Sequence, residues 1–311
     1  MFRGFITDIP GIDVGHAHNI DAGTGCTVVL CKKGAVAGVD VRGSAPGTRE
    51  TDLIRPGNLI EKIHAVMLSG GSAFGLAAAD GAMEYLEQNG IGFDVGKTKV
   101  PIVASAVLFD LYYKDWRIRP DKQMGYEACT NVRSAFFEQG SVGAGTGATV
   151  GKILGMKNSM KGGVGTASIC IPNGAIVGAI LAVNSFGDCI DPLTGEIIAG
   201  AKNPDTGGFL CTKSYMLSNG LNKTVSIGNT TIGVVATNAR LTKEQANKIA
   251  SMAHDGLARS INPVHTMLDG DTIFVMSTCE VDAELNTLGV AAVEVVARAV
   301  VNAVKSANNV S

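Results

Sequence analysis

Apolar residues along the chain fall into short runs rich in β-branched residues and longer segments with helical spacing. The short runs predict strands. They span 26–31, 35–41, 65–68, 100–111, 165–171, 175–184, 230–238 and 272–278. The longer segments predict helices at 73–88, 125–138, 242–261 and 284–307. A further strand precedes a polar turn at 16–25.

Turn and capping residues divide these runs. Lys32-Lys33-Gly34 and Pro172-Asn173-Gly174 each predict a hairpin turn between two strands. Ser72 is the expected N-cap of the first helix and Gly90 its stop, whereas Thr242 with Gln245 forms a capping box. Residues 186–222 show no clear periodicity and are expected to be a loop-rich connection beside which a chain break is tolerated.

The order of these elements predicts the fold class. Paired strands are followed by helices without regular strand–helix alternation, which indicates an α+β fold with antiparallel sheet enclosed by helices. No internal repeat or linker divides the chain, so residues 1–311 are expected to form one domain. With 46% hydrophobic and 17% charged residues, the chain has ample material for a core.

Charge and cysteine content limit the classes of function. The net charge is −2 and no basic run occurs, so the sequence lacks the clustered positive charge that is typical of nucleic-acid-binding proteins. The first residues lack the basic-then-apolar layout of a signal peptide, and the final helix carries Glu294, Arg298 and Lys305, so we expect no membrane partner. Seven cysteines, an odd number without a Cys-x-x-Cys pair, are expected to be reduced core residues of a cytoplasmic protein.

The strand that starts at Thr230 carries the main chemical hypothesis. A threonine hydroxyl held beside the carbonyl of Asn229 can attack that carbonyl and break the chain between the two residues. The new α-amine would then serve as the base for the same hydroxyl. The alternative is an ordinary buried strand, because Asn-Thr-Thr occurs in many strands and also begins a glycosylation triplet.

The glycine-rich stretch from Gly145 to Ile153 has three interpretations. A phosphate-binding loop needs four residues between its outer glycines and a Ser or Thr after the lysine. Here five residues separate Gly145 from Gly151, and Ile153 follows Lys152. A flexible loop with a surface lysine is the plain alternative. The third interpretation places Lys152 in a polar cleft, where its amine would assist a hydroxyl nucleophile or stabilise negative charge.

Two further motifs favour structural roles. Ser72 lies between a predicted strand and a helix, but Phe74 stands where a nucleophile elbow needs glycine, so helix capping explains the serine better. None of the five histidines stands in a recognisable triad context. His16 and His18 have metal-ligand spacing without an acidic or cysteine partner, so no metal is expected.

Two carboxylates flank a glycine at Asp269-Gly270-Asp271, just before a predicted strand. If both face one pocket, their repulsion separates their pKa values and equips them to orient an amine and shuttle protons. The alternative is a plain acidic turn.

Four ordered motifs together resemble one family, the self-processing peptidases of the L-aminopeptidase/D-esterase type, over nearly the whole chain. The motifs are Ile9-Pro-Gly-Ile-Asp-Val-Gly-His16, Arg42-Gly-Ser-Ala-Pro-Gly-Thr-Arg49, Leu68-Ser-Gly-Gly-Ser-Ala-Phe-Gly-Leu76 and Asn229-Thr-Thr-Ile-Gly-Val-Val-Ala-Thr237. Within the family, His265-Thr-Met-Leu-Asp269-Gly-Asp271 looks closer to the branch with nylon-oligomer (6-aminohexanoate oligomer) hydrolases. The aminopeptidase branch tends to have serine and glutamate at the positions of the two aspartates.

The resemblance implies a four-layer αββα sandwich like that of N-terminal-nucleophile hydrolases, with different connectivity. It also implies self-cleavage into fragments 1–229 and 230–311, which remain paired and assemble into homo-oligomers, tetramers or larger. Transferred by position, the catalytic residues would be Thr230 as nucleophile, Lys152, Asn184 as oxyanion donor, Asp269 and Asp271. We transfer no tyrosine, although Tyr112 and Tyr113 lie near a plausible place.

The sequence therefore predicts a cofactor-free hydrolase of small amides, such as short peptides and β- or ω-amino amides. One rival is an uncleaved ligand-binding or assembly protein with the same fold. A second rival is a serine hydrolase that uses Ser72.

Overall fold

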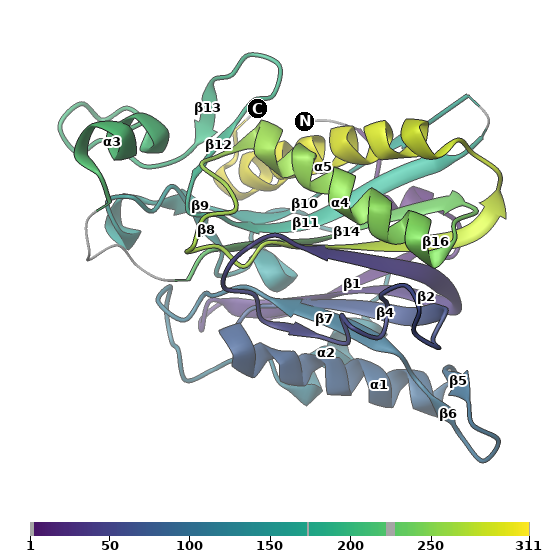
Figure 1. Ribbon diagram of the computed structural model, residues 1–311. Coiled ribbons are helices and arrows are strands. Elements are labelled where there is room, and N and C mark those ends of the chain that lie inside the picture. Colours follow the sequence, from purple (N-terminus) through teal and green to yellow (C-terminus); the bar gives the residue numbers. More distant parts are fainter. Residues whose placement is uncertain (1–2, 173, 222–227, 311) are drawn as a thin grey trace.

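The computed structural model describes residues 3–172, 174–221 and 228–310, and it has four layers in the order helix, sheet, sheet, helix (Figure 1). One pair of helices covers one sheet layer, and a second pair covers the other (Figure 1). The helices are α1 (Ala78–Gln88), α2 (Lys122–Thr130), α4 (Lys243–Ser260) and α5 (Leu285–Asn308). The predicted αββα sandwich is therefore confirmed.

The strands follow the order β10-β11-β14-β16-β2-β4-β7-β3, and β1 also pairs with β2. Neighbours are antiparallel except for β14 with β16 and β4 with β7, which are parallel. The strands are β1 (Asp13–Asn19), β2 (Thr24–Val41), β3 (Thr48–Arg49), β4 (Lys62–Ser69), β7 (Val103–Val107), β10 (Gly163–Cys170), β11 (Ile176–Asn184), β14 (Thr230–Ala239) and β16 (Thr272–Val281).

Strand β2 joins the two sheet layers, and here the predicted hairpin at Lys32-Lys33-Gly34 is wrong. The first half of β2 pairs with β1 and β4, whereas residues 36–41 pair with β16. The register with β4 shifts between Leu30 and Ala35, so the lysines and glycine form a bulge in one continuous strand. Gly34 has φ +77°, which bends the strand from one layer into the other instead of reversing it.

Several helix boundaries differ from the prediction. The first helix begins as a 3-10 turn at Ser72, but Gly71 is its N-cap and Ser72 itself has φ +53°. The helix predicted at 125–138 is shorter and earlier, because Asp121 caps its N-terminus by accepting a bond from the Met124 N–H at 2.9 Å. The capping box of Thr242 and Gln245 is confirmed.

The smaller elements gather at the ends of the layers. The connection predicted to be loop-rich over 186–222 contains β12 (Asp188–Ile190), β13 (Ile197–Ala199) and α3 (Thr212–Asn219), and its last residue lies outside the described part. The strands around 172–174 form the predicted hairpin, although Asn173 is not described. The rest are η1 (Ile6–Asp8), η2 (Ser72–Ala77), η3 (Gly143–Gly145), η4 (Met156–Asn158), β5 (Phe93–Asp94), β6 (Lys99–Val100), β8 (Thr149–Val150), β9 (Met160–Lys161) and β15 (Ile261–Asn262).

Three apolar clusters hold the layers together. One lies between the two sheets, one between the upper sheet and helices α4 and α5, and one between the lower sheet and helices α1 and α2. Helix α5 is long and apolar enough to cross a membrane by composition alone, but most of it is buried against β10, β11 and α4. Its composition is thus accounted for by packing in the core.

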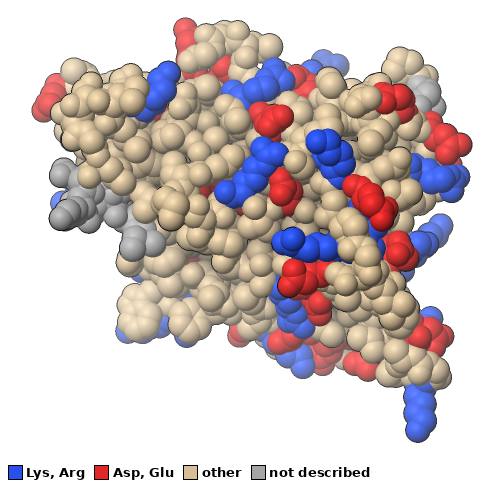
Figure 2. Space-filling view, in the orientation of Figure 1, with Lys and Arg blue, Asp and Glu red and all other residues tan. Residues whose placement is uncertain are grey.

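The surface and the cysteines add two details. On the face in Figure 2, Lys and Arg side chains are interspersed with Asp and Glu side chains. The seven cysteines form no disulfide, and four of them are buried as expected. Cys170 is exposed, while Cys211 and Cys279 are half-buried, so the expectation that all are core residues is wrong for these three.

Candidate active site

The parallel pairing of β14 with β16 places the two main sequence motifs side by side. Ile232 pairs with Thr272, so the residues just before these positions meet at the same end of the sheet. Asn229 forms a bridge with Asp269, and the Asn229 N–H donates to the Leu268 carbonyl at 3.2 Å. The Asp-Gly-Asp turn therefore lies beside Thr230.

The Asn229 carbonyl is held by two donors. The Thr230 hydroxyl donates to this oxygen, and the Gly270 N–H donates to it at 3.0 Å. Thr230 is buried, with 4% of its surface exposed. Gly270 is close to the hydroxyl as well, because a Cβ at this position would lie 2.9 Å from Thr230 Oγ1. The Thr230 hydroxyl, the Asn229 carbonyl and a backbone N–H donor to the carbonyl oxygen thus lie together.

Asn184 lies on the adjacent strand, and Lys152, which follows β8, contacts it. Asn184 ends β11 and is the register partner of Thr230. The Lys152 amine donates to the Asn184 carbonyl at 2.9 Å and to its Oδ1 at 2.8 Å. Burial lowers the pKa of Lys152 to about 7, while the charge of Asp269 opposes this shift. An amine that is partly neutral near pH 7 can accept a proton from a hydroxyl.

A glycine turn aims Lys152 inward. Gly151 has φ +71°, and a Cβ there would lie 2.1 Å from the Ala201 nitrogen, so only glycine fits. The backbone N–H of Lys152 donates to the Phe186 carbonyl at 3.0 Å. Of the three interpretations of this stretch, the structure therefore excludes a surface lysine, since Lys152 is only 2% exposed.

The amide group of Asn184 already has partners in the uncleaved chain. Its Oδ1 also accepts from the Thr149 N–H at 2.9 Å, and its Nδ2 donates to the Phe109 carbonyl at 2.9 Å. Because an amide nitrogen carries two hydrogens, the second remains available for an oxyanion. The sequence did not predict Phe109 as a residue of the site. The nearest indication was the pair Tyr112 and Tyr113, a few residues later in the chain.

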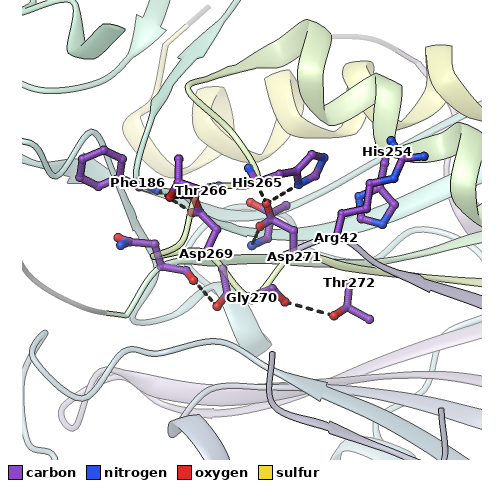
Figure 3. Close-up of polar contacts among 12 residues, drawn as sticks. Arg42, Phe186, His254, His265, Thr266, Asp269, Gly270, Asp271 and Thr272 are labelled. Carbon is purple, nitrogen blue, oxygen red and sulfur yellow. Dashed lines mark hydrogen bonds and ion pairs between the residues drawn. The ribbon is translucent and has the colours of Figure 1, made fainter. Parts of the chain in front are cut away.

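The two carboxylates are buried and differ in their partners (Figure 3). Asp269 accepts from the backbone N–H groups of Thr266 at 3.0 Å and Phe186 at 3.3 Å, and from the Thr266 hydroxyl. Burial, and then the charge of Asp271, raise the pKa of Asp269 to about 6. Asp271 accepts from the Thr231 N–H at 2.7 Å and lies 2.8 Å from Nδ1 of His265. The turn is therefore part of the site and not a plain surface turn.

A narrow pocket opens beside Lys152. It is lined by Phe109, Asp110, Tyr112, Tyr113, Gly147, Thr149, Lys152, Met156 and Gly228. Its volume is about 10 Å³, so the uncleaved chain leaves almost no room there for a substrate. Gly228 closes one side with φ +119°, and a Cβ there would lie 2.5 Å from the Phe109 ring. Gly228, which precedes Asn229, is thus part of the pocket wall.

The residues of the rival motifs lie elsewhere. Ser72 stands after β4, and in the described chain its hydroxyl bonds none of the histidines. His16 Nδ1 lies 2.8 Å from the Thr27 hydroxyl, and His18 Nδ1 accepts from the Gly143 N–H at 3.4 Å. These side chains are engaged with protein groups, and the structure does not bring them to Thr230.

Comparison with known proteins gives a consistent assignment. Residues 5–311 match Peptidase family S58. The chain is 42% identical to an uncharacterized aminopeptidase of Mycobacterium leprae (strain TN), covering 98% of this chain and 91% of that protein. It is 31% identical to the 6-aminohexanoate-oligomer endohydrolase of Kocuria sp. (strain KY2), covering 88% of this chain and 75% of that protein.

A solved structure shares the fold. The L-aminopeptidase D-Ala-esterase/amidase of Ochrobactrum anthropi, described as a variant of the Ntn-hydrolase fold, superposes with a TM-score of 0.73 at 22% identity. The match covers 97% of this chain and 86% of that one. The predicted family resemblance is confirmed.

Proposed function

Because the chain belongs to peptidase family S58 and is therefore an amide-bond hydrolase, we propose that it cuts itself between Asn229 and Thr230 and then uses Thr230 as its nucleophile. The observation that carries the proposal is the contact of the Thr230 hydroxyl with the Asn229 carbonyl, whose oxygen also accepts from the Gly270 N–H. An ordinary buried strand does not require either contact.

Self-cleavage would proceed by an acyl shift. Thr230 Oγ1 attacks the Asn229 carbonyl carbon while its proton passes to a base, for which neutral Lys152 is the candidate. The Gly270 N–H stabilises the oxygen that becomes negative. The C–N bond then breaks, the nitrogen takes the proton as the new α-amine, and an ester links Asn229 to Thr230. Water hydrolyses this ester and leaves a carboxylate on Asn229 and a free hydroxyl on Thr230.

Substrate hydrolysis would repeat the same chemistry on another amide. The hydroxyl of Thr230 attacks the substrate carbonyl, with its own α-amine or Lys152 as the base. Asn184 Nδ2 is the proposed oxyanion donor, and Asp269 and Asp271 position the amines. The leaving amine takes up the proton, and water releases the acyl group.

The proposed substrates are small amides. They include amides of the N-terminal residues of short peptides and of β- or ω-amino acids, and membership of a peptidase family with aminopeptidase relatives supports them. The name of the Kocuria relative supports 6-aminohexanoate oligomers as further candidates. The proposed reaction uses no cofactor.

The two fragments, 1–229 and 230–311, are proposed to stay together after cleavage. Strand β14 lies between β11 and β16 inside the sheet, and all ten of its residues are buried. Separation would expose this strand and its neighbours to water, which opposes dissociation. Assembly of such pairs into homo-oligomers remains part of the proposal.

Denaturing electrophoresis and intact-mass measurement test the proposal on the purified chain. Two fragments, the smaller one beginning with Thr230, support it. A full-length chain that persists after long incubation favours the rival binding or assembly protein. For the second rival, a chain with Ser72→Ala should keep nearly all its activity, whereas a serine hydrolase would lose it.

A further inference from the structure

A histidine supports the Asp271 carboxylate from the side opposite to Thr231. Asp271 Oδ2 accepts from the backbone N–H of His265 at 3.2 Å and lies 2.8 Å from Nδ1 of its ring (Figure 3). Asp271 Oδ1 accepts from the Thr231 N–H at 2.7 Å. One carboxylate thus joins the histidine to the amide that directly follows the proposed nucleophile. We propose that His265 is a positioning residue, which holds Asp271 so that the Thr231 amide, and with it the Thr230 hydroxyl, stays aimed at the reacting carbonyl.

The hydrogen-bond pattern fixes which ring nitrogen carries the proton. Asp271 accepts from two backbone N–H groups, and Nδ1 of His265 faces the same carboxylate, so a hydrogen on Nδ1 can be donated to it. His265 Nε2 is buried and has no hydrogen-bond partner within the described residues. A hydrogen on Nε2 would find no partner among the described residues, which supports its placement on Nδ1.

The backbone of His265 is a second, independent observation. Its φ is +54°, a left-handed conformation that non-glycine residues adopt rarely and that persists where surrounding contacts fix it. This conformation brings both the backbone N–H and the ring nitrogen to the same carboxylate oxygen.

A neighbouring histidine holds the ring in place. His254 on α4 is fully buried, and its ring centroid lies 4.9 Å from that of His265 in an edge-on arrangement. Its Nε2 lies 3.0 Å from the Asp40 carbonyl, which only accepts, so this nitrogen carries the hydrogen. Burial lowers the pKa of His254 to about 4, so its imidazole is neutral near pH 7. The ring of His265 packs against this neutral side chain.

The charged groups around this pair come from two other segments and from α4 itself. Asp271 and Asp269 face it from the turn before β16, and Asp40 and Arg42 face it from the end of β2. Arg42 is held by Asp40 at 3.0 Å and by Asp255 at 3.4 Å. These carboxylates and Ser251 occupy the guanidinium, so among the described residues His265 is the side chain placed to donate to Asp271.

The inference rests on the proposed role of Thr230, and a matched pair of variants tests it. His265→Asn keeps an N–H donor near the place of Nδ1 and tolerates the left-handed backbone. Aspartate has nearly the same size as asparagine and also tolerates the left-handed backbone, but His265→Asp presents an acceptor to Asp271 instead of a donor. His265→Gly removes the side chain and any backbone strain. His64→Asn, far from the site on β4, controls for loss of a histidine.

The readouts are the self-cleavage rate, and kcat and KM on an aminoacyl p-nitroanilide between about pH 5 and 9. We expect His265→Asp and His265→Gly to slow both reactions by about 10- to 100-fold, the order expected when one hydrogen bond to a charged group is lost. The loss should fall on kcat more than on KM, and the acid side of the pH profile should move to higher pH. His265→Asn and His64→Asn should stay within about threefold of the unaltered chain.

Equal rates for His265→Asn and His265→Asp at similar thermal stability would overturn the inference, and so would an unimpaired His265→Gly. The unaltered chain and Thr230→Val are measured alongside. If the unaltered chain neither cleaves itself nor turns over amides, the proposed function fails and this inference fails with it. If the unaltered chain is active but the Asn and Asp variants do not differ, only the role of His265 is wrong.

Discussion

The Lys152 amine lies 2.8 Å from Oδ1 and 2.9 Å from the carbonyl oxygen of Asn184, the residue paired with Thr230 across the sheet. The amine is thereby held against the end of the strand next to the proposed nucleophile, where it is buried. Burial at this position lowers its pKa to about 7, so much of the population is neutral where a general base has to operate.

Replacement of Lys152 by Met should therefore slow both self-cleavage and substrate hydrolysis. Methionine keeps most of the side-chain volume and removes the amine, so the expected loss is that of general-base catalysis, about 10²- to 10⁴-fold. Rates of fragment formation and of hydrolysis of a short amide measure the two steps.

Lys243 offers the matched control, since its side chain is also buried and its amine donates to the Asn58 carbonyl at 2.6 Å, away from Thr230. Lys243→Met should leave both rates near those of the unaltered chain. If both variants lost the same rate of cleavage and hydrolysis, the loss would come from removing a buried amine from the fold, and Lys152 would not be the base.

The depressed pKa of Lys152 also predicts how stability depends on pH. The folded state releases this proton near pH 7, whereas the unfolded state holds it to about 10.5. Between these values the unfolded chain binds more protons, so stability gains a contribution that rises with pH and is absent below about pH 7. Thermal unfolding of Thr230→Ala, with and without Lys152→Met, should show this difference between pH 7 and 10. Parallel pH curves would contradict it.

The side chain of Thr230 is predicted to be essential for the first step. Thr230→Val keeps the shape of the residue and removes the hydroxyl, so the chain should remain intact and inactive but folded. Thr230→Ser restores a hydroxyl and should restore cleavage at a lower rate. N-terminal sequencing of the small fragment decides between the adjacent threonines, because a cut before Thr230 gives Thr-Thr-Ile and a cut before Thr231 gives Thr-Ile.

The sequence predicted most of the strands, because their residue composition and alternation are local patterns. Asp269-Gly270-Asp271 and Thr230 were each visible as residues placed just before a strand. The parallel pairing of β14 with β16, which makes them neighbours, is a long-range contact that no local pattern encodes.

Two other features were missed for different reasons. The bulge at Gly34 uses the same residues as a hairpin turn, and the choice between them depends on which strands pair with β2 on either side. The bond from Asn184 to Phe109 could not be predicted from residue type, because its acceptor is the backbone carbonyl, which every residue has.

The last prediction concerns Gly270, whose backbone N–H donates to the Asn229 carbonyl at 3.0 Å. A Cβ at this position would lie 2.9 Å from Thr230 Oγ1 and 2.5 Å from the Ala45 carbonyl oxygen, and the latter is backbone that cannot easily move. Gly270→Ala should therefore displace the turn, weaken the bond to the Asn229 oxygen and slow self-cleavage by about 10²-fold or more, as for loss of one oxyanion donor. Gly208→Ala is the control, because its nearest neighbour would be 3.7 Å away. Cleavage of Gly270→Ala at the rate of Gly208→Ala, measured by the appearance of the small fragment, would show that this backbone donor does not support the reaction.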